Sequence, residues 1–441
     1  MSTETLLQLR AGQLAGATEL RLSCGLKEVP PEIFDLADSL EILHLTGNEL
    51  SDLPDDLPRL KKLRILFCSQ NLFRHLPPVL GDCPSLRMVG FKANAIETVA
   101  EKSLSPSLRW LILTDNRISH LPASLGNCRE MQKLMLSGNL LASLPEEMAQ
   151  CSQLELLRLA ANRFTELPSW LLALPRLAWL AFGGNPCSTL PNLPALPSIE
   201  WSQLSIREKL GAGASGDIYK AALTRGDDAA PLPVAVKLFK GAVTSDGLPG
   251  QEMIACMAAG VHPHLTETLG RVTGHPDKTE GLVMSLIPSE CRNLAGPPSF
   301  DSCTRDVYAE GTRFSVAETL QIAKAVASSS AHLHSRGLLH ADLYAHNVLW
   351  DPLKTCLFGD FGAASFFSQA PPAQAESLQK IEARAFGYLL EELLERCVAE
   401  PGDKLAWNAL KTLQHQCLTL HIADRPLFSE IQEELERISK I

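Results

Sequence analysis

Three polar residues in the C-terminal half of the chain have types and spacings that suit chemistry on a phosphate group. Asp342 and Asn347 are five residues apart, and Asp360 follows thirteen residues later, directly before Phe361 and Gly362. Phosphoryl transfer needs a carboxylate that orients and deprotonates the acceptor hydroxyl, and oxygen ligands for a Mg²⁺ ion that bridges the phosphates. Asp342 is the candidate for the first role. Asn347 and Asp360 are the candidate metal ligands.

A lysine that can hold phosphates ends an apolar strand pattern further upstream. Lys237 follows Val234-Ala235-Val236, and Glu252 comes fifteen residues later in a helical pattern that ends before His262-Pro263. A lysine at the α- and β-phosphates of a nucleotide needs a carboxylate partner that fixes its position. Glu252 is the candidate partner. The alternative is that Glu252 is an ordinary solvent-exposed helix residue.

A glycine-rich segment precedes this lysine. Gly211, Gly213 and Gly216 form a GxGxxG pattern, and Ile218 follows two positions after the last glycine. Glycines allow backbone amides to approach phosphates without obstruction by side chains. The pattern alone is weak because dinucleotide-binding folds share it, and an ordinary flexible turn is the other alternative. The apolar Ile218 favours the form of the loop that occurs in kinases.

In this order, the motifs resemble the protein kinase family over roughly residues 204–441. The resemblance implies a two-lobed α+β domain that binds ATP and Mg²⁺ and phosphorylates a protein hydroxyl. It also implies an adenine-holding strand and hinge, with Met284 in the gatekeeper position. The residues implied at the site are Asp342, Lys237 and Glu252 as catalytic residues, Gly211, Gly213, Gly216, Ile218, Lys237, Met284, Ser285 and Ile287 at the nucleotide, and Asn347 and Asp360 at the metal.

Two substitutions in the catalytic motif depart from the family pattern. Ala341 replaces the arginine that usually precedes the catalytic aspartate and pairs with a phosphorylated activation loop. We therefore expect no switching by phosphorylation of that loop. Tyr344 stands where serine/threonine kinases usually carry lysine. The choice between a Ser/Thr and a Tyr acceptor therefore stays open.

The activation segment is shorter than the family pattern. Only 22 residue steps separate Asp360 from Glu382, which stands where the family has aspartate. No clear Ala-Pro-Glu motif lies between them, and Gln374-Ala375-Glu376 is the nearest relic. The usual platform for a substrate peptide is then reduced. Arg425, in the closing arginine motif, would need another partner, with Glu376 and Glu382 as candidates.

The N-terminal half is built from repeats. Asparagines recur every 22 or 23 residues in the frame LxxLxLxxNxL, at Asn48, Asn71, Asn94, Asn116, Asn139, Asn162 and Asn185. Leucines such as Leu43 and Leu45 alternate inward on a short strand, and each coil buries them against its neighbours. The pattern predicts a leucine-rich-repeat solenoid of α/β class whose asparagines hydrogen-bond the backbone. An irregular eighth unit and a helix over residues 3–14 are expected to cap its open end.

The residues that flank the inward leucines must face the concave side of the solenoid. They are unusually apolar for a solvated sheet face, and such patches often mark protein interfaces. We predict a protein-binding surface, with the alternative that the kinase half of the chain covers it. Its predicted members are Ile42, Ile65, Phe67, Met88, Trp110, Ile112, Met135, Leu156 and Trp179.

These patterns predict a leucine-rich-repeat domain over 1–195, a short proline-rich boundary over 196–203 and a kinase domain over 204–441, which resembles bacterial leucine-rich-repeat kinases. The net charge of -10 argues against a nucleic-acid partner. The absence of a long apolar run predicts no membrane span, and twelve cysteines without a CxxC pair suit the cytoplasm. The alternatives to a protein kinase are a repeat scaffold with little catalysis and, less favoured, a small-molecule kinase.

Overall fold

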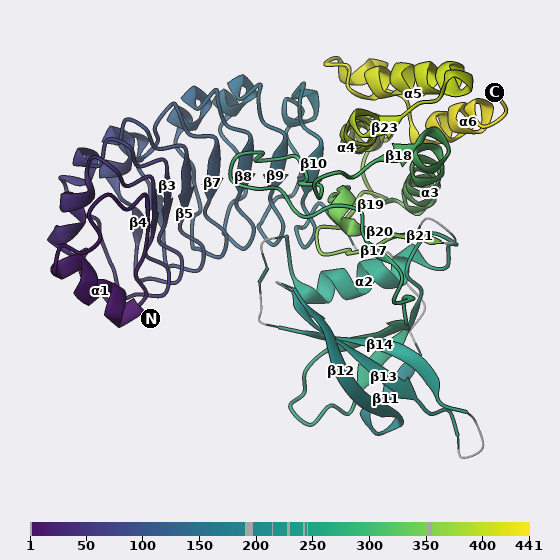
Figure 1. Ribbon diagram of the computed structural model, residues 1–441, viewed down its shortest axis with the longest axis horizontal. Coiled ribbons are helices and arrows are strands. Elements are labelled where there is room, and N and C mark those ends of the chain that lie inside the picture. Colours follow the sequence, from purple (N-terminus) through teal and green to yellow (C-terminus); the bar gives the residue numbers. More distant parts are fainter. Residues whose placement is uncertain are drawn as a thin grey trace. The chain divides into compact units, whose positions relative to one another are not determined.

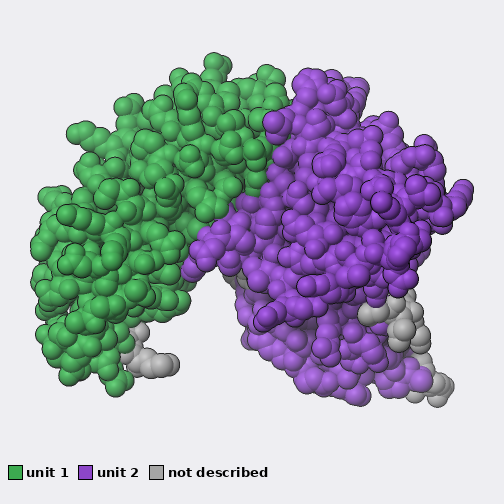
Figure 2. All heavy atoms as spheres, turned by 45° about the horizontal axis from the view of Figure 1, so that its top comes forward, with its two compact units in different colours: residues 1–177 green, residues 178–441 purple. Residues whose placement is uncertain are grey.

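The chain forms two compact units, residues 1–177 and 178–441 (Figure 2). The computed structural model describes residues 2–189, 197–213, 215–226, 230–240, 243–244, 246–351 and 355–441. Most of the proline-rich stretch ahead of the kinase motifs, residues 190–196, lies outside these described residues. Within the described ranges, no helix combines the length and apolar character that a bilayer span requires.

The first unit is a repeat array in which each coil contributes one short strand to a parallel sheet (Figure 1). Helix α1, Ser2–Arg10, precedes the first coil. The paired strands are β1 (Glu19–Arg21), β2 (Ile42–His44), β3 (Ile65–Phe67), β5 (Met88–Gly90), β7 (Trp110–Ile112), β8 (Lys133–Met135) and β9 (Leu156–Arg158), and a second parallel pair is β4 (His75–Leu76) with β6 (Thr98–Val99). Short 3₁₀ helices cross the other side of the coils at Pro31–Leu36, Leu57–Arg59, Pro78–Asp82, Glu101–Ser103, Ala123–Asn127, Glu146–Gln150 and Leu171–Ala173.

The repeat asparagines tie neighbouring coils together, as the spacing predicted. The Asn48 amide donates to the carbonyls of Leu22 at 2.8 Å and Leu45 at 2.9 Å, and its oxygen accepts from the backbone N–H groups of Cys24 and Leu26 at 3.0 Å. One coil later, the Asn71 amide donates to the carbonyls of Leu45 at 2.9 Å and Cys68 at 3.1 Å, and its oxygen accepts from the Leu50 N–H at 2.9 Å. Since the inward leucines are fully buried, these backbone groups cannot reach water, and the asparagine satisfies them instead.

The predicted concave patch is less exposed than the sequence suggested. Ile65, Met88 and Leu156 are 3–4% exposed. Ile65 lies directly opposite Met88, and Met88 opposite Trp110, so large side chains on adjacent strands cover one another. The prediction that Ile65, Met88 and Leu156 present a binding surface is therefore wrong. The members that keep partial exposure are Ile42, Phe67, Trp110, Ile112 and Met135.

Among the described residues, the second unit contains an N-terminal lobe of six strands and one helix, which Figure 1 shows. The strand order is β11-β15-β16-β14-β13-β12. Val234, Val236 and Val283 fill the apolar side of this sheet. The elements are β11 (Ser198–Glu200), β12 (Leu204–Ala212), β13 (Gly216–Leu223), β14 (Leu232–Phe239), α2 (Pro249–Ala259), β15 (Thr268–Thr273) and β16 (Gly281–Ser285), with a 3₁₀ turn at Trp201–Gln203.

The C-terminal lobe of this unit is mainly helical. A capping box of Ser315 and Glu318 begins α3, in which the Ser315 hydroxyl accepts from the Glu318 N–H at 3.2 Å. The long helices are α3 (Val316–Ser335), α4 (Pro372–Glu395), α5 (Lys404–Cys417) and α6 (Phe428–Ile438). Outside the N-terminal lobe, the short elements of the second unit are β10 (Trp179–Ala181), β17 (Arg292–Asn293), β18 (Phe314–Ser315), β19 (Leu338–Leu339), the 3₁₀ turn Ala345–Asn347, β20 (Val348–Asp351), β21 (Thr355–Phe358), β22 (Ser365–Phe366), β23 (Cys397–Val398), and the 3₁₀ turns Pro401–Asp403 and Ile422–Asp424.

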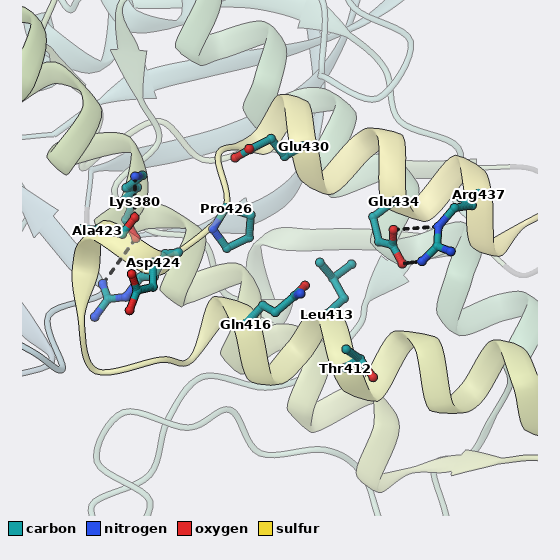
Figure 3. A pocket seen from close by; sticks show the side chains of 11 residues that line it. Lys380, Thr412, Leu413, Gln416, Ala423, Asp424, Pro426, Glu430, Glu434 and Arg437 are labelled. Carbon is teal, nitrogen blue, oxygen red and sulfur yellow. Dashed lines mark hydrogen bonds and ion pairs between the residues drawn. The ribbon is translucent and has the colours of Figure 1, made fainter.

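Arg425 lies buried between these helices, beside a cavity of about 450 Å³ that α4, α5 and α6 line (Figure 3). It donates to the carbonyls of Thr419 at 3.0 Å and Lys380 at 3.3 Å. Glu376 lies in the first turns of α4 and pairs with Lys380 at 2.7 Å. The prediction that Glu376 or Glu382 replaces the family's partner of Arg425 is wrong: Glu382 pairs with His334 at 2.6 Å instead.

Candidate active site

Lys237 and Glu252 form a buried ion pair between strand β14 and helix α2. The lysine side chain is 10% exposed and the glutamate side chain 3%. This excludes the alternative of a solvent-exposed Glu252. Burial works against the charged lysine, but Glu252 and Asp360 outweigh it and raise the pKa of the Lys237 ammonium above its ordinary value. Lys237 therefore stays charged at neutral pH.

The glycine loop forms the turn between β12 and β13, where the Gly213 N–H donates to the Gly216 carbonyl at 2.8 Å. A Cβ on Gly216 would collide with the carbonyl of Leu238 on the adjacent strand, so the fold itself requires this glycine. A Cβ on Gly211 would meet nothing within 4 Å. Packing therefore does not explain Gly211, which lines the cavity between the two lobes.

A cavity of about 540 Å³ separates the two lobes of this unit. Nine of the predicted site residues line it, and Gly213, Gly216 and Asp342 do not. Ser285 ends strand β16, where its N–H donates to the Glu267 carbonyl at 2.9 Å. In the part of the chain that the structure describes, the backbone N–H and C=O of Ile287 make no hydrogen bond, which leaves them available to a ligand. The predicted residues in the lining are Gly211, Ile218, Lys237, Glu252, Met284, Ser285, Ile287, Asn347 and Asp360.

Asn347 fixes the orientation of Asp342. Its Nδ2 donates to the Asp342 carbonyl at 2.9 Å and to the Asp342 carboxylate Oδ2 at 2.7 Å. Because a carbonyl oxygen can only accept, this pair of bonds sets which end of the amide is nitrogen. The Oδ1 of Asn347 then points away from Asp342 and remains available as an oxygen ligand.

Two residues of the candidate site hold a left-handed backbone conformation, Ala341 in the catalytic segment (residues 340–347) and Asp360. Ala341 has φ of 62° and Asp360 has φ of 64°. For residues other than glycine this region is unfavourable by roughly 1–2 kcal/mol, and such strain is concentrated at functional sites. The His340 ring connects the catalytic segment to the residues just before Asp360. Its Nε2 bonds the Gly359 carbonyl at 2.9 Å, and it stacks on Phe358 with ring centroids 3.9 Å apart.

Glu382 holds the strained catalytic segment in place through hydrogen bonds to its carboxylate. Its carboxylate accepts from the Ala341 N–H at 2.5 Å, from the His340 N–H at 3.4 Å and from His334 at 2.6 Å. Burial alone would favour the neutral carboxyl. The bonds from His334 and Ala341 outweigh burial and hold the pKa of Glu382 below its ordinary value. The extra methylene of glutamate thus does not prevent this residue from anchoring the loop.

Sequence reasoning missed several residues of the cavity. Ala235 and Leu349 supply apolar walls, and each has a positional signal: Ala235 lies two residues before Lys237, and Leu349 two after Asn347. His346 had no such signal. Its Nδ1 and N–H bond the buried Asp306 carboxylate at 2.8 and 2.9 Å. Burial works against the charged ring, but Asp306 outweighs it and raises the pKa of His346.

The structure contradicts the prediction that Trp179 belongs to an open binding surface. The side chain is 1% exposed. Its Nε1–H donates to the Leu343 carbonyl at 2.9 Å, and its ring stacks on Tyr344 with centroids 4.3 Å apart. Trp179 therefore contacts the catalytic segment. For this residue the structure agrees with the alternative that the kinase half of the chain covers the patch.

A glycine hairpin, a sheet lysine paired with a helix glutamate, and an Asp-Asn loop beneath them define the fold of a protein kinase catalytic domain. The comparisons agree with this assignment. Residues 204–384 match the family model for protein tyrosine and serine/threonine kinases, and residues 106–164 match the model for leucine-rich repeats. The chain thus combines leucine-rich repeats with a protein kinase domain.

Individual relatives are distant. The chain is 28% identical to the proto-oncogene serine/threonine-protein kinase mos of Sus scrofa over 41% of this chain and 54% of that one. It is 26% identical to the epidermal growth factor receptor of Apis mellifera over 58% of this chain and 22% of that one. It therefore spans about half or less of the length of these relatives. A solved leucine-rich-repeat protein of Leptospira interrogans is 32% identical, with a TM-score of 0.38, over 40% of this chain and 45% of that chain.

Proposed function

We propose that the chain transfers the γ-phosphoryl group of ATP to a hydroxyl group of a protein. The observation that carries the proposal is that Lys237, its partner Glu252, Asn347 and Asp360 all line one cavity. Asp342 is hydrogen-bonded to Asn347 at the edge of this cavity. Lys237 would hold the α- and β-phosphates, with Glu252 fixing it. Asp342 would orient the acceptor hydroxyl and take its proton.

The cavity suits ATP in size and in the distribution of its polar groups. One end has apolar walls and backbone groups at Ile287 that bond no other described residue, which suits a purine base. The other end carries Lys237, Asn347 and Asp360, which suit phosphates and a hard cation. The Oδ1 of Asn347 and the carboxylate of Asp360 would hold Mg²⁺, which when bound neutralises charge on the phosphates.

The test is phosphate transfer by the purified full chain. Protein is incubated with γ-labelled ATP and Mg²⁺, with added acceptor proteins, beside an Asp342→Asn variant. We expect label on protein from the wild type and a loss of at least about 100-fold in the variant, with nucleotide binding retained. Nucleotide binding without transfer in the wild type would contradict the proposal and favour a scaffold. Transfer to small hydroxyl compounds instead of protein would favour a small-molecule kinase.

We also propose that the repeats bind a protein substrate or regulator through the partly exposed members of the concave patch. Trp110 carries most of this proposal, because aromatic side chains often dominate protein interfaces. Its ring is covered on one face by Lys133, whose Nζ lies 4.5 Å from the ring centroid. The companions of Trp110 in the patch are Ile42, Phe67, Ile112 and Met135.

The second test compares two variants of the repeats. Acceptor proteins that the wild type phosphorylates are titrated against Trp110→Glu and against Trp170→Glu, a partly buried tryptophan outside the patch. Binding through the patch predicts a rise in KM for the protein acceptor of about tenfold or more in the first variant only. The KM for ATP should not change. Equal kinetics in both variants would show that the patch does not recruit the acceptor.

A further inference from the structure

A column of stacked rings in the second unit begins at His346, which lines the cavity of the candidate active site. Tyr344 stacks on His346 with centroids 5.0 Å apart, and Trp179 stacks on Tyr344 at 4.3 Å with an interplanar angle of 4°. The other neighbour of Trp179 is Tyr388 at 5.4 Å, and the guanidinium of Arg305 covers the Tyr388 ring at 3.4 Å. Trp179 is thus the central member of a column that begins at a residue lining the cavity.

The residues after Trp179 hold the segment that follows Asp360-Phe361-Gly362. The backbone N–H groups of Phe182 and Gly183 donate to the Ser365 hydroxyl at 2.8 and 3.0 Å. The Ser188 hydroxyl accepts from the Phe366 N–H and donates to the Phe366 carbonyl, both at 3.1 Å. Strand β22, which contains both Ser365 and Phe366, pairs with β19. It is therefore held by β19 and also by residues 182–188.

The contact at Gly183 is too close for any other residue. A Cβ at this position would lie 2.7 Å from the Ala364 carbonyl oxygen, a distance that real Cβ atoms essentially never show. The obstructing atom belongs to the backbone and cannot rotate away. Ser188 and Ser365 are 4% and 0% exposed. The burial of Ser188 and Ser365 and the close backbone approach at Gly183 both indicate a specific, well-packed contact.

The shortened activation segment explains why such a contact is needed. Helix α4 begins at Pro372, so only residues 363–371 link the Asp360 motif to it. In addition, Ala341 cannot supply the arginine that ties the catalytic segment to a phosphorylated loop. A segment with so few residues has little surface of its own to bury, and the strained conformations of Ala341 and Asp360 need support from their surroundings.

We propose that residues 179–188 are a working part of the catalytic centre, and we call this segment the brace. The brace supplies support that the shortened activation segment does not give: Trp179 holds the catalytic segment through Leu343 and Tyr344, and Phe182 to Ser188 hold strand β22. Trp179 is a positioning residue, since it acts on Asp342 through its neighbours. The proposal deepens the kinase activity proposed above and rests on it.

The test uses the full chain and two changes in the brace, Trp179→Ala and Gly183→Ala. The matched controls are Trp170→Ala and Gly402→Ala. A Cβ added at Gly402 meets nothing within 4 Å. Hydrogen exchange is followed in residues 341–347 and 363–368, and phosphate transfer and binding of trinitrophenyl-ATP are measured on the same samples. We expect exchange at least about tenfold faster in both brace variants. The kcat should fall about 100-fold, with nucleotide affinity nearly unchanged.

A conservative variant separates positioning from general loss of structure. Trp179→Phe keeps an aromatic ring but removes the Nε1–H donor, and should recover part of the kcat and of the exchange protection. Unchanged exchange in both brace variants would overturn the proposal. Faster transfer by Trp179→Ala would also overturn it, because the segment would then block the site. If the wild type transferred no phosphate, only the proposed kinase activity would be refuted, because the comparison of hydrogen exchange tests the brace independently.

Discussion

The side-chain amide of Asn347 bonds the carboxylate of Asp342 at 2.7 Å, so one residue holds the proposed base and offers its other end to the metal. Asn347→Ala should therefore weaken two functions at once. We expect kcat to fall by at least about 100-fold and the Mg²⁺ concentration for half-maximal transfer to rise. The measurement is a magnesium titration of transfer. The control is Asn408→Ala on the exposed side of α5, and wild-type magnesium dependence in Asn347→Ala would contradict the assignment.

The buried pair of Lys237 and Glu252 should serve activity rather than stability. Removing one partner leaves a buried charge, so Glu252→Leu should destabilise the domain by about 3–5 kcal/mol. Replacing both by apolar residues, as Lys237→Met with Glu252→Leu, should restore most of that stability and leave transfer undetectable. Thermal unfolding and transfer assays on the three variants test this. A double variant less stable than Glu252→Leu alone would show that the pair stabilises the fold.

Glu392 should make stability depend on pH. Burial, with Asp306 nearby, raises the pKa of this carboxyl from 4.5 to about 8, so the folded state binds a proton that the unfolded state releases. Its contribution is complete below pH 4.5 and is lost as pH rises toward 8, by up to about 1.4 kcal/mol per pH unit. Glu392→Gln should gain stability relative to the wild type across this range.

Thermal unfolding at several pH values measures the difference between these two proteins. Gln should keep the bond that the Asp306 N–H donates to Oε1 at 3.1 Å, so the geometry is nearly unchanged. The control is Glu395→Gln, whose side chain is 62% exposed at the end of the same helix. A stability difference that stays constant with pH would contradict the raised pKa of Glu392.

Local patterns predicted most of the fold and the polar centre of the site. The repeat period predicted the short parallel strands, and the spacings of Lys237, Asp342, Asn347 and Asp360 predicted residues that the structure brings to one cavity or its edge. These motifs are readable because backbone geometry dictates them: a strand, a turn and a loop of set length. Their catalytic roles remain predictions.

The errors concern residues whose surroundings come from distant segments. The sequence frame of Trp179 is the same as that of Trp110, yet Trp179 packs on Tyr344, 165 positions along the chain. The prediction that Arg425 pairs with a carboxylate failed similarly, because backbone carbonyls of Thr419 and Lys380 meet its guanidinium. Neither packing partner is encoded by local spacing. Periodicity shows which way a side chain points, and only tertiary structure shows what it meets.

Each repeat asparagine of the first unit should stabilise mainly its own coil and the coils next to it. The Asn116 amide donates to the carbonyls of Phe91 at 2.9 Å and Leu113 at 3.0 Å, and its oxygen accepts from the Ile96 N–H at 3.0 Å. Asn116→Ala leaves these buried groups unsatisfied, at about 1–3 kcal/mol each before relaxation. We expect chemical denaturation of the repeats to begin at a clearly lower denaturant concentration, with Asn127→Ala, an exposed asparagine, near the wild type. Because each coil buries its leucines only against its neighbours, exchange should rise in coils next to Asn116 first. A uniform rise across the unit would instead indicate that the repeats unfold as one block.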